Sequence, residues 1–129
     1  MLNTALLSAR RLLLTLSDAQ ALPNTTNADS TNIIDIGGGG VMGLTPVFVR
    51  IRMPAITLTG ILTIKVMSCD TADGTYAEYC RKVLPAAAYT GEEIYALGLI
   101  NPEQYVKLNY VSLENLSSAT ISADIVGNL

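Results

Sequence analysis

Val47-Phe48-Val49-Arg50-Ile51-Arg52-Met53 is the stretch that decides the fold class, because its apolar residues recur at every second position. Successive side chains of a β-strand point to opposite faces of the sheet. The odd-numbered residues therefore share one apolar face, and the even-numbered ones, Arg50 and Arg52 among them, share the other. A period of two over seven residues predicts a strand with one buried face.

The same alternation recurs along the chain. Strong alternation marks residues 62–67, 105–110 and 120–125, and weaker strand patterns mark residues 11–16, 32–36, 76–83 and 93–97. Glycine and proline separate these segments, and the sequence offers no helical stripe beyond a turn or two at residues 3–11. About eight short strands with turn signals between them predict an all-β protein, an antiparallel β-sandwich or jelly roll.

Composition indicates a single domain that buries part of its surface against other proteins. The chain has 129 residues, of which half are apolar and 15% are charged, against about 25% charged in typical soluble domains. So few charges leave apolar surface that copies of the chain or a partner would cover. We divide the chain into an N-terminal arm, residues 1–11, and one sandwich domain, residues 12–129. The apolar cluster at the N-terminus is too short for a signal peptide, so we expect the arm to be retained.

Charge and hydropathy argue against two classes of partner. The net charge is −3 and the basic residues are scattered, whereas a nucleic-acid surface needs clustered basic residues. No apolar run approaches the roughly 18–20 residues that span a bilayer. We expect neither a nucleic acid nor a membrane as partner.

The motifs that resemble catalytic or cofactor sites lack the context that their chemistry needs. Gly38-x-Gly40-x-x-Gly43 matches a dinucleotide fingerprint, but Pro46 and a strand follow it where a helix N-terminus should hold the pyrophosphate. Asp70-Thr71-Ala72 departs from the Asp-Thr-Gly of aspartic proteases and precedes an Asp-Gly turn. The chain has no histidine, which excludes nucleophilic catalysis through histidine, and its two cysteines fall short of the four ligands of a metal site. With these motifs set aside, we expect no enzyme, no cofactor and no metal site.

The two cysteines, Cys69 and Cys80, flank a predicted two-residue turn at Asp73-Gly74. A symmetric hairpin would place Cys69 opposite Glu78 and Cys80 opposite Met67, so that the cysteines become diagonal neighbours. Diagonal neighbours usually lie too far apart for a relaxed disulfide. The spacing favours two reduced thiols, and a Cys69–Cys80 disulfide stays open as the alternative.

Several stretches of the sequence resemble the small capsid cement proteins of tailed bacteriophages, a family whose type member comes from a Bordetella phage. They are LSDAQA at residues 16–21, STNIIDIG at 30–37, LPAAAYTGEEIYALGLI at 84–100 and YVKLNYV at 105–111. Each stretch alone is loose, and their order along the chain carries the resemblance. The arm and the two cysteines have no counterpart in the family.

The resemblance implies a jelly-roll subunit, a capsid decoration protein without cofactor, that assembles as a homotrimer. The trimers would bind the major capsid protein on the outer surface of an icosahedral head assembled in the bacterial cytoplasm. The candidate contact residues for the trimer or the capsid are Leu2, Leu6, Leu7, Arg10, Arg11, Arg50 and Arg52. The alternative is a carbohydrate-binding β-sandwich on the virion surface, because six tyrosines offer stacking platforms for sugars.

Overall fold

The computed structural model describes residues 12–36, 47–100 and 102–127. These residues form eleven strands. The strands are β1 (Leu12–Ala21), β2 (Asn27–Asp29), β3 (Ile34–Asp35), β4 (Val47–Arg52), β5 (Ala55–Leu58), β6 (Leu62–Cys69), β7 (Ala77–Leu84), β8 (Ala87–Thr90), β9 (Ile94–Gly98), β10 (Tyr105–Ser112) and β11 (Thr120–Gly127).

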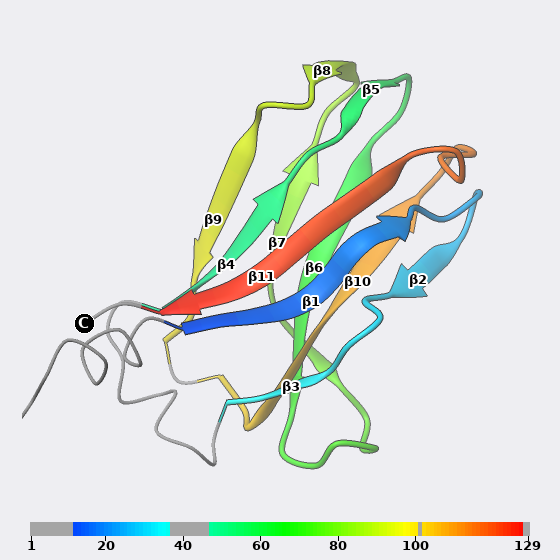
Figure 1. Ribbon diagram of the computed structural model, residues 1–129. Coiled ribbons are helices and arrows are strands. Elements are labelled where there is room, and N and C mark those ends of the chain that lie inside the picture. The colour runs from blue at the N-terminus through cyan, green and yellow to red at the C-terminus, as the bar shows by residue number, and fades with distance from the viewer. Residues whose placement is uncertain (1–11, 37–46, 101, 128–129) are drawn as a thin grey trace, which may run out of the picture.

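Two antiparallel sheets pack against each other, which confirms the predicted all-β sandwich (Figure 1). The first sheet has the order β1-β11-β4-β9, and the second has the order β2-β10-β6-β7, with β3 also pairing with β10. The short strands β5 and β8 pair with each other at one end of the sandwich. β1 and β11, the first and last strands that the structure describes, are neighbours, so both ends of the described chain lie in the first sheet.

The core lies between the two sheets and is built by the predicted alternation. The four central strands, β4, β6, β10 and β11, bury every second side chain and supply most of the core. Those buried residues are Val47, Val49 and Ile51 of β4, Leu62, Ile64 and Val66 of β6, Val106, Leu108 and Tyr110 of β10, and Ile121, Ala123 and Ile125 of β11. Each large apolar side chain in such a core contributes about 1.5–3 kcal/mol over exposure to water.

Three short strands escape the sequence patterns. β2 lies inside residues 23–31, which their polar composition marks as a surface loop, and it becomes a strand because it pairs with β10. β5 and β8 are four residues each and pair only with each other. A strand of three or four residues is too short for an alternation of period two to be recognised in the sequence.

The connection between β6 and β7 corrects the predicted two-residue turn. Residues 70–76 form the turn, and a bulge between Val66 and Met67 shifts the register of the strands. Met67 therefore faces Glu78, and Cys80 faces Val66. Cys69 faces Tyr105 on the other neighbouring strand, β10. Both cysteines are free, Cys69 buried and Cys80 half-buried.

Candidate interaction surface

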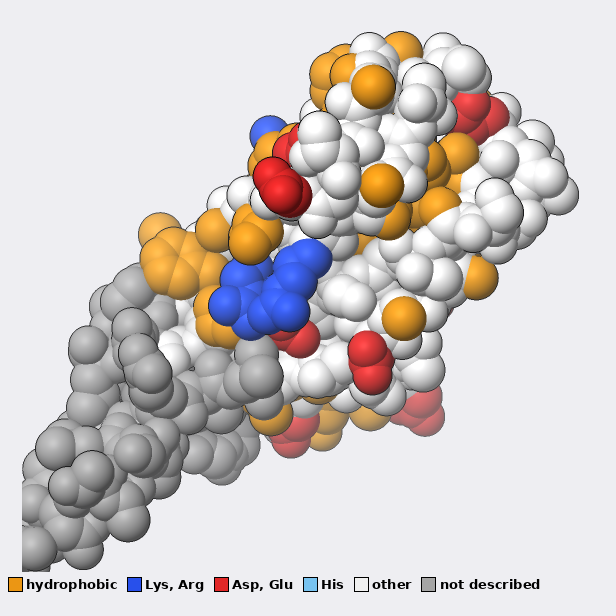
Figure 2. Space-filling view, turned by 45° about the horizontal axis from the view of Figure 1, so that its top comes forward, with side chains coloured by type: hydrophobic (Ala, Val, Ile, Leu, Met, Phe, Trp, Pro, Cys, Tyr) orange, Lys and Arg blue, Asp and Glu red, His pale blue; other side chains and the backbone are white. Residues whose placement is uncertain are grey.

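The outer face of the first sheet brings two of the candidate contact residues together around one carboxylate. Nη2 of Arg50 lies 3.1 Å from Oδ2 of Asp124, and Nη2 of Arg52 lies 3.7 Å from the same oxygen. The register explains this, because Arg50 on β4 is the direct cross-strand partner of Asp124 on β11. Figure 2 shows basic side chains gathered over an acidic group on this face.

This arginine cluster, Arg50, Arg52 and Asp124, carries one positive charge in excess. The Asp124 side chain is only 12% exposed, whereas the Arg52 side chain is 50% exposed. The Nε of Arg50 is buried and has no hydrogen-bond partner among the described residues. The exposed Arg52 guanidinium leaves room for a carboxylate or a carbonyl oxygen supplied by a partner.

Apolar residues flank the arginine cluster on the same face. Phe48 and Val126 are cross-strand partners and are both half-buried. Ile94 lies opposite Arg52 on the next strand and is 60% exposed. Arginine beside exposed aromatic and aliphatic side chains is the composition typical of protein–protein interfaces.

Large exposed apolar side chains occur in the part of the chain that the structure describes, as the low charge content predicts. They are Ile33, Ile61, Val83, Ile94, Ile100 and Leu113. Ile94 is the first residue of β9 and Ile100 follows its end, and Ile61 and Leu113 adjoin the paired residues Leu62 and Ser112 at one end of the second sheet. They offer apolar surface that a partner could cover.

The outer face of the second sheet differs, because ion pairs connect most of its charges. Lys107 lies 2.9 Å from Asp29 and 4.3 Å from the centre of the Tyr76 ring, and Arg81 binds Glu78 at 2.6 Å. Burial alone would raise the pKa of Asp29, but hydrogen bonds from Lys107 and Asn109 lower it below its ordinary value. This face is typical of a solvated surface.

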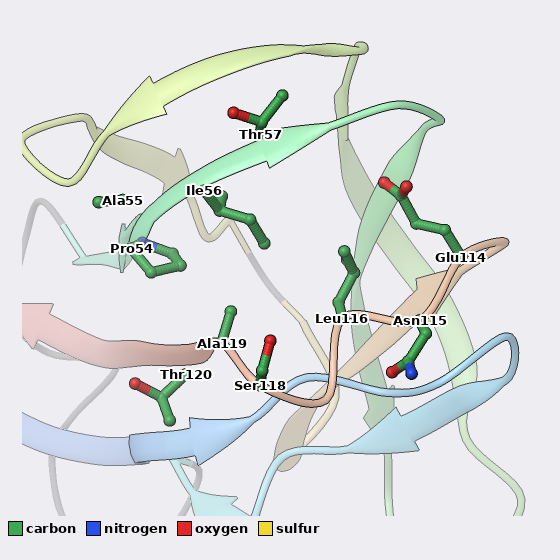
Figure 3. A pocket seen from close by; sticks show the side chains of 10 residues that line it. All are labelled: Pro54, Ala55, Ile56, Thr57, Glu114, Asn115, Leu116, Ser118, Ala119 and Thr120. Carbon is green, nitrogen blue, oxygen red and sulfur yellow. The ribbon is translucent and has the colours of Figure 1, made fainter.

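A hollow of about 430 Å³ lies between β5 and the segment that joins β10 to β11 (Figure 3). Its walls include Pro54, Ile56, Leu116 and Ser118, and its single ionisable side chain is Glu114. The Glu114 carboxylate accepts hydrogen bonds from the backbone N–H of Thr59 and Gly60 and from the Thr59 hydroxyl. Glu114 thus holds the β5–β6 turn, and the hollow lacks a second group for acid–base chemistry.

The remaining candidates from the sequence are placed as follows. Within the described ranges, no cluster of three His, Cys, Asp or Glu residues is placed to hold a metal ion. No helix in these ranges is long and apolar enough to cross a membrane. Asp70 is exposed in the β6–β7 turn. The arm residues Leu2, Leu6, Leu7, Arg10 and Arg11, and the glycine motif at 38–43, lie outside the described residues.

Five of the six tyrosines have a structural contact that explains them. Tyr110 is buried in the core. Tyr79 and Tyr89 donate hydrogen bonds to backbone carbonyls, of Ile100 and Pro85. The rings of Tyr76 and Tyr95 lie under Lys107 and Lys82. These contacts give no support to the sugar-platform alternative.

Comparisons with known proteins reveal a likeness in fold. No family model and no curated protein matches the sequence. The structure is similar to a chain of Desmodium yellow mottle tymovirus, with a TM-score of 0.51 and 12% identity, covering 91% of this chain and 81% of that chain. It is also similar to a chain from the crystal structure of PirA, with a TM-score of 0.43 and 12% identity, covering 92% of each chain. The likeness to the virus chain shows a shared fold and nothing further.

Proposed function

We propose that this protein is a structural cement protein of a bacteriophage head. It binds the outer surface of the icosahedral capsid as a trimer and holds neighbouring major capsid subunits together. The observation that carries the proposal is the β-sandwich, a fold shared with a chain of a virus, in a sequence whose segments follow the order of the phage cement family.

The chemistry of the outer face of the first sheet supports the same role. A cement protein needs surface that binds protein, and the arginine cluster beside Phe48, Val126 and Ile94 has that composition. Contacts repeated by symmetry add as avidity, so each subunit can contribute modest binding energy. Binding to the mature lattice and to no earlier state stabilises that lattice by mass action.

Head binding by the purified protein tests the proposal. The protein is mixed with heads that lack it, and bound copies are counted by gel densitometry and by electron cryomicroscopy. We expect saturable binding at symmetry-related positions, with three copies around each occupied three-fold position of the lattice. Saturating protein that leaves the heads bare would overturn the cement role.

Paired variants locate the contact surface. Arg52→Ala removes an arginine that is 50% exposed on the first sheet, and Arg81→Ala removes one that is 49% exposed on the second sheet. We expect Arg52→Ala to lower head occupancy and Arg81→Ala to leave it unchanged. Removal of residues 1–11 tests the arm in the same assay, and full occupancy without them would exclude an arm contact.

A further inference from the structure

β9 is a free edge strand. It pairs with β4 on one side, and no described residue pairs with its other side, which faces outward in Figure 1. Its sequence, Ile-Tyr-Ala-Leu-Gly, contains neither charge nor proline, and its register with β4 runs without a bulge. A regular, uncharged edge presents a row of unpaired N–H and C=O groups that can bind another strand.

The hydrogen bonds at the two ends of β9 fix which backbone groups face outward. Leu99 donates to the carbonyl of Val47 at 2.9 Å, and Met53 donates to the carbonyl of Glu93 at 3.0 Å. In an antiparallel pair, hydrogen-bonded and non-hydrogen-bonded residues alternate. The odd-numbered residues of β9 therefore bond to β4, and Ile94, Ala96 and Gly98 point their N–H and C=O groups outward.

Contacts on both sides limit this open edge to three residues. The next outward residue after Gly98 is Ile100, whose N–H and C=O both bind the Tyr79 hydroxyl, at 2.7 and 2.6 Å. Before Ile94, the N–H of Glu92 donates to the Thr90 hydroxyl. The open edge comprises Ile94, Ala96 and Gly98.

In the two large sheets, the other edge strands carry features that block pairing, and β9 lacks them; the four-residue strands β5 and β8 form a separate pair. β7, at the matching edge of the second sheet, has Glu78, Arg81 and a bulge, and its Lys82 lies over the Tyr95 ring between the sheets. β1 has two register shifts, and β2 and β3 are three and two residues long. Charges, bulges and shortness are the usual protection of sheet edges, so β9 stands out as the strand left open.

We propose that β9 pairs antiparallel with β9 of a second copy of this chain, about a two-fold axis that places Ala96 opposite Ala96. This register puts outward-facing residues opposite each other, as the hydrogen bonding requires. It also places Ile94 opposite Gly98 of the second copy, so a large side chain meets the smallest one. No like charges meet, because β9 has none.

The exposed apolar side chains support a second copy as the occupant. Ile94 is 60% exposed and Ile100 is 76% exposed, and they lie at the two ends of the open edge. A two-fold pairing brings the Ile94 end of each strand against the Ile100 end of the other, so both isoleucines lose water contact. The two four-stranded sheets then form one continuous sheet across the axis.

This contact is independent of the proposed trimer, because a two-fold contact and a three-fold contact use different surfaces and symmetries. A chain that forms only the β9 contact is a dimer, and one that forms both closes as a hexamer when the two-fold axes cross the three-fold axis at right angles. Light scattering over a range of concentrations is therefore expected to give a dimer or hexamer mass. A monomer or a trimer at all concentrations would overturn the β9 proposal and leave the cement proposal standing.

A charge-swap experiment tests the register. In Ala96→Lys, two lysines face each other across the axis, and we expect the assembly mass to fall to half. Ala96→Glu should behave alike, and an equimolar mixture of the two variants should recover the mass of the unsubstituted protein. Ala77→Lys, at an exposed position of β7, is the matched control and should leave the mass unchanged. Circular dichroism verifies that each variant is folded.

Hydrogen exchange distinguishes the odd-numbered amides of β9 from the even-numbered ones. The amides of Tyr95 and Leu97 are protected by β4 in every state. The amides of Ile94, Ala96 and Gly98 should exchange freely in Ala96→Lys and be protected in the assembled protein. Free exchange of these three amides in the assembled protein, or an unchanged mass of Ala96→Lys, would refute the pairing.

Discussion

Tyr110 links the two sheets through a buried hydrogen bond, and Tyr110→Phe tests what this bond does. The side chain lies in β10 with no exposed surface, and its hydroxyl lies 2.8 Å from the Oγ of Ser17 in β1. Ser17 donates its own proton to Oε1 of Gln20 at 2.6 Å, so the Tyr110 hydroxyl is the donor to Ser17. Burial raises the pKa of Tyr110 from 10.0 to about 12.

At neutral pH the substitution removes one hydrogen bond without leaving a buried donor unpaired. Ser17 keeps Gln20 as its partner, so we expect a loss of about 1 kcal/mol in the free energy of unfolding. Ser17→Ala is the harsher change, because it leaves the Tyr110 hydroxyl buried without an acceptor. That cost is about 1–3 kcal/mol, and adding Tyr110→Phe to Ser17→Ala should recover part of it.

At alkaline pH the order of stability reverses. A group whose pKa is higher in the folded state contributes stability that is complete below its unfolded pKa and is lost as pH rises through its folded pKa. For Tyr110 this window runs from pH 10 to about 12. Two pKa units correspond to about 3 kcal/mol, which exceeds the hydrogen bond, so above pH 12 Tyr110→Phe should be the more stable protein by about 1–2 kcal/mol.

Urea unfolding followed by circular dichroism, at one protein concentration and at several pH values from neutral to alkaline, measures the reversal. Tyr89→Phe is the control, because the Tyr89 ring is only half-buried and its variant should show a smaller change with pH. Curves for Tyr110→Phe and the unsubstituted protein that stay parallel up to the alkaline limit would refute the reasoning.

Two further predictions concern carboxylates. Asp124→Asn leaves Arg50 and Arg52 facing each other without their shared carboxylate, so urea unfolding should show a loss of about 2 kcal/mol in the free energy of unfolding. If the cluster is coupled, Arg52→Ala should lower the free energy of unfolding less in the Asp124→Asn protein than in the unsubstituted protein. Acid should destabilise the protein, because the pKa values of Glu78, Glu93 and Glu114 are lowered by hydrogen bonds, chiefly from Arg81, Thr90 and Thr59. Their contribution is complete above the ordinary glutamate pKa and is lost as pH falls through the lowered values, so Glu114→Gln should unfold with a shallower acid dependence, and an unchanged slope would contradict this.

The sequence predicts the long strands well because their pattern is local. Alternation at residues 47–53 places Val49 in the core and Arg50 on the outer face, and the structure confirms both. β5 and β8 were missed because each is four residues long and exists only by pairing with the other. A strand that forms only by pairing with a distant segment has no periodic pattern in its own sequence.

The interaction surface could be predicted only in part. The alternation of β11 places Asp124 on the polar side of its strand, but its role depends on β4 being the neighbour of β11, a pairing across more than seventy residues. The cysteine partners were wrong for a similar reason. A bulge and a seven-residue turn shift the register of β6 and β7, and Asp-Gly alone does not distinguish this turn from a tight one.

The uneven protection of the sandwich edges connects the fold with assembly. The second sheet carries paired charges on its face and a bulge at its β7 edge, whereas the first sheet leaves β9 bare between two exposed isoleucines. Selection for a soluble monomer would favour a charge or a proline in β9, because an open edge promotes aggregation. An open edge flanked by apolar side chains is therefore a feature of a chain that assembles. Head binding tests the cement role, and assembly mass tests the β9 contact. A trimer that coats heads would support the cement role and refute the β9 contact. An even-numbered assembly that does not bind heads would support the β9 contact and refute the cement role.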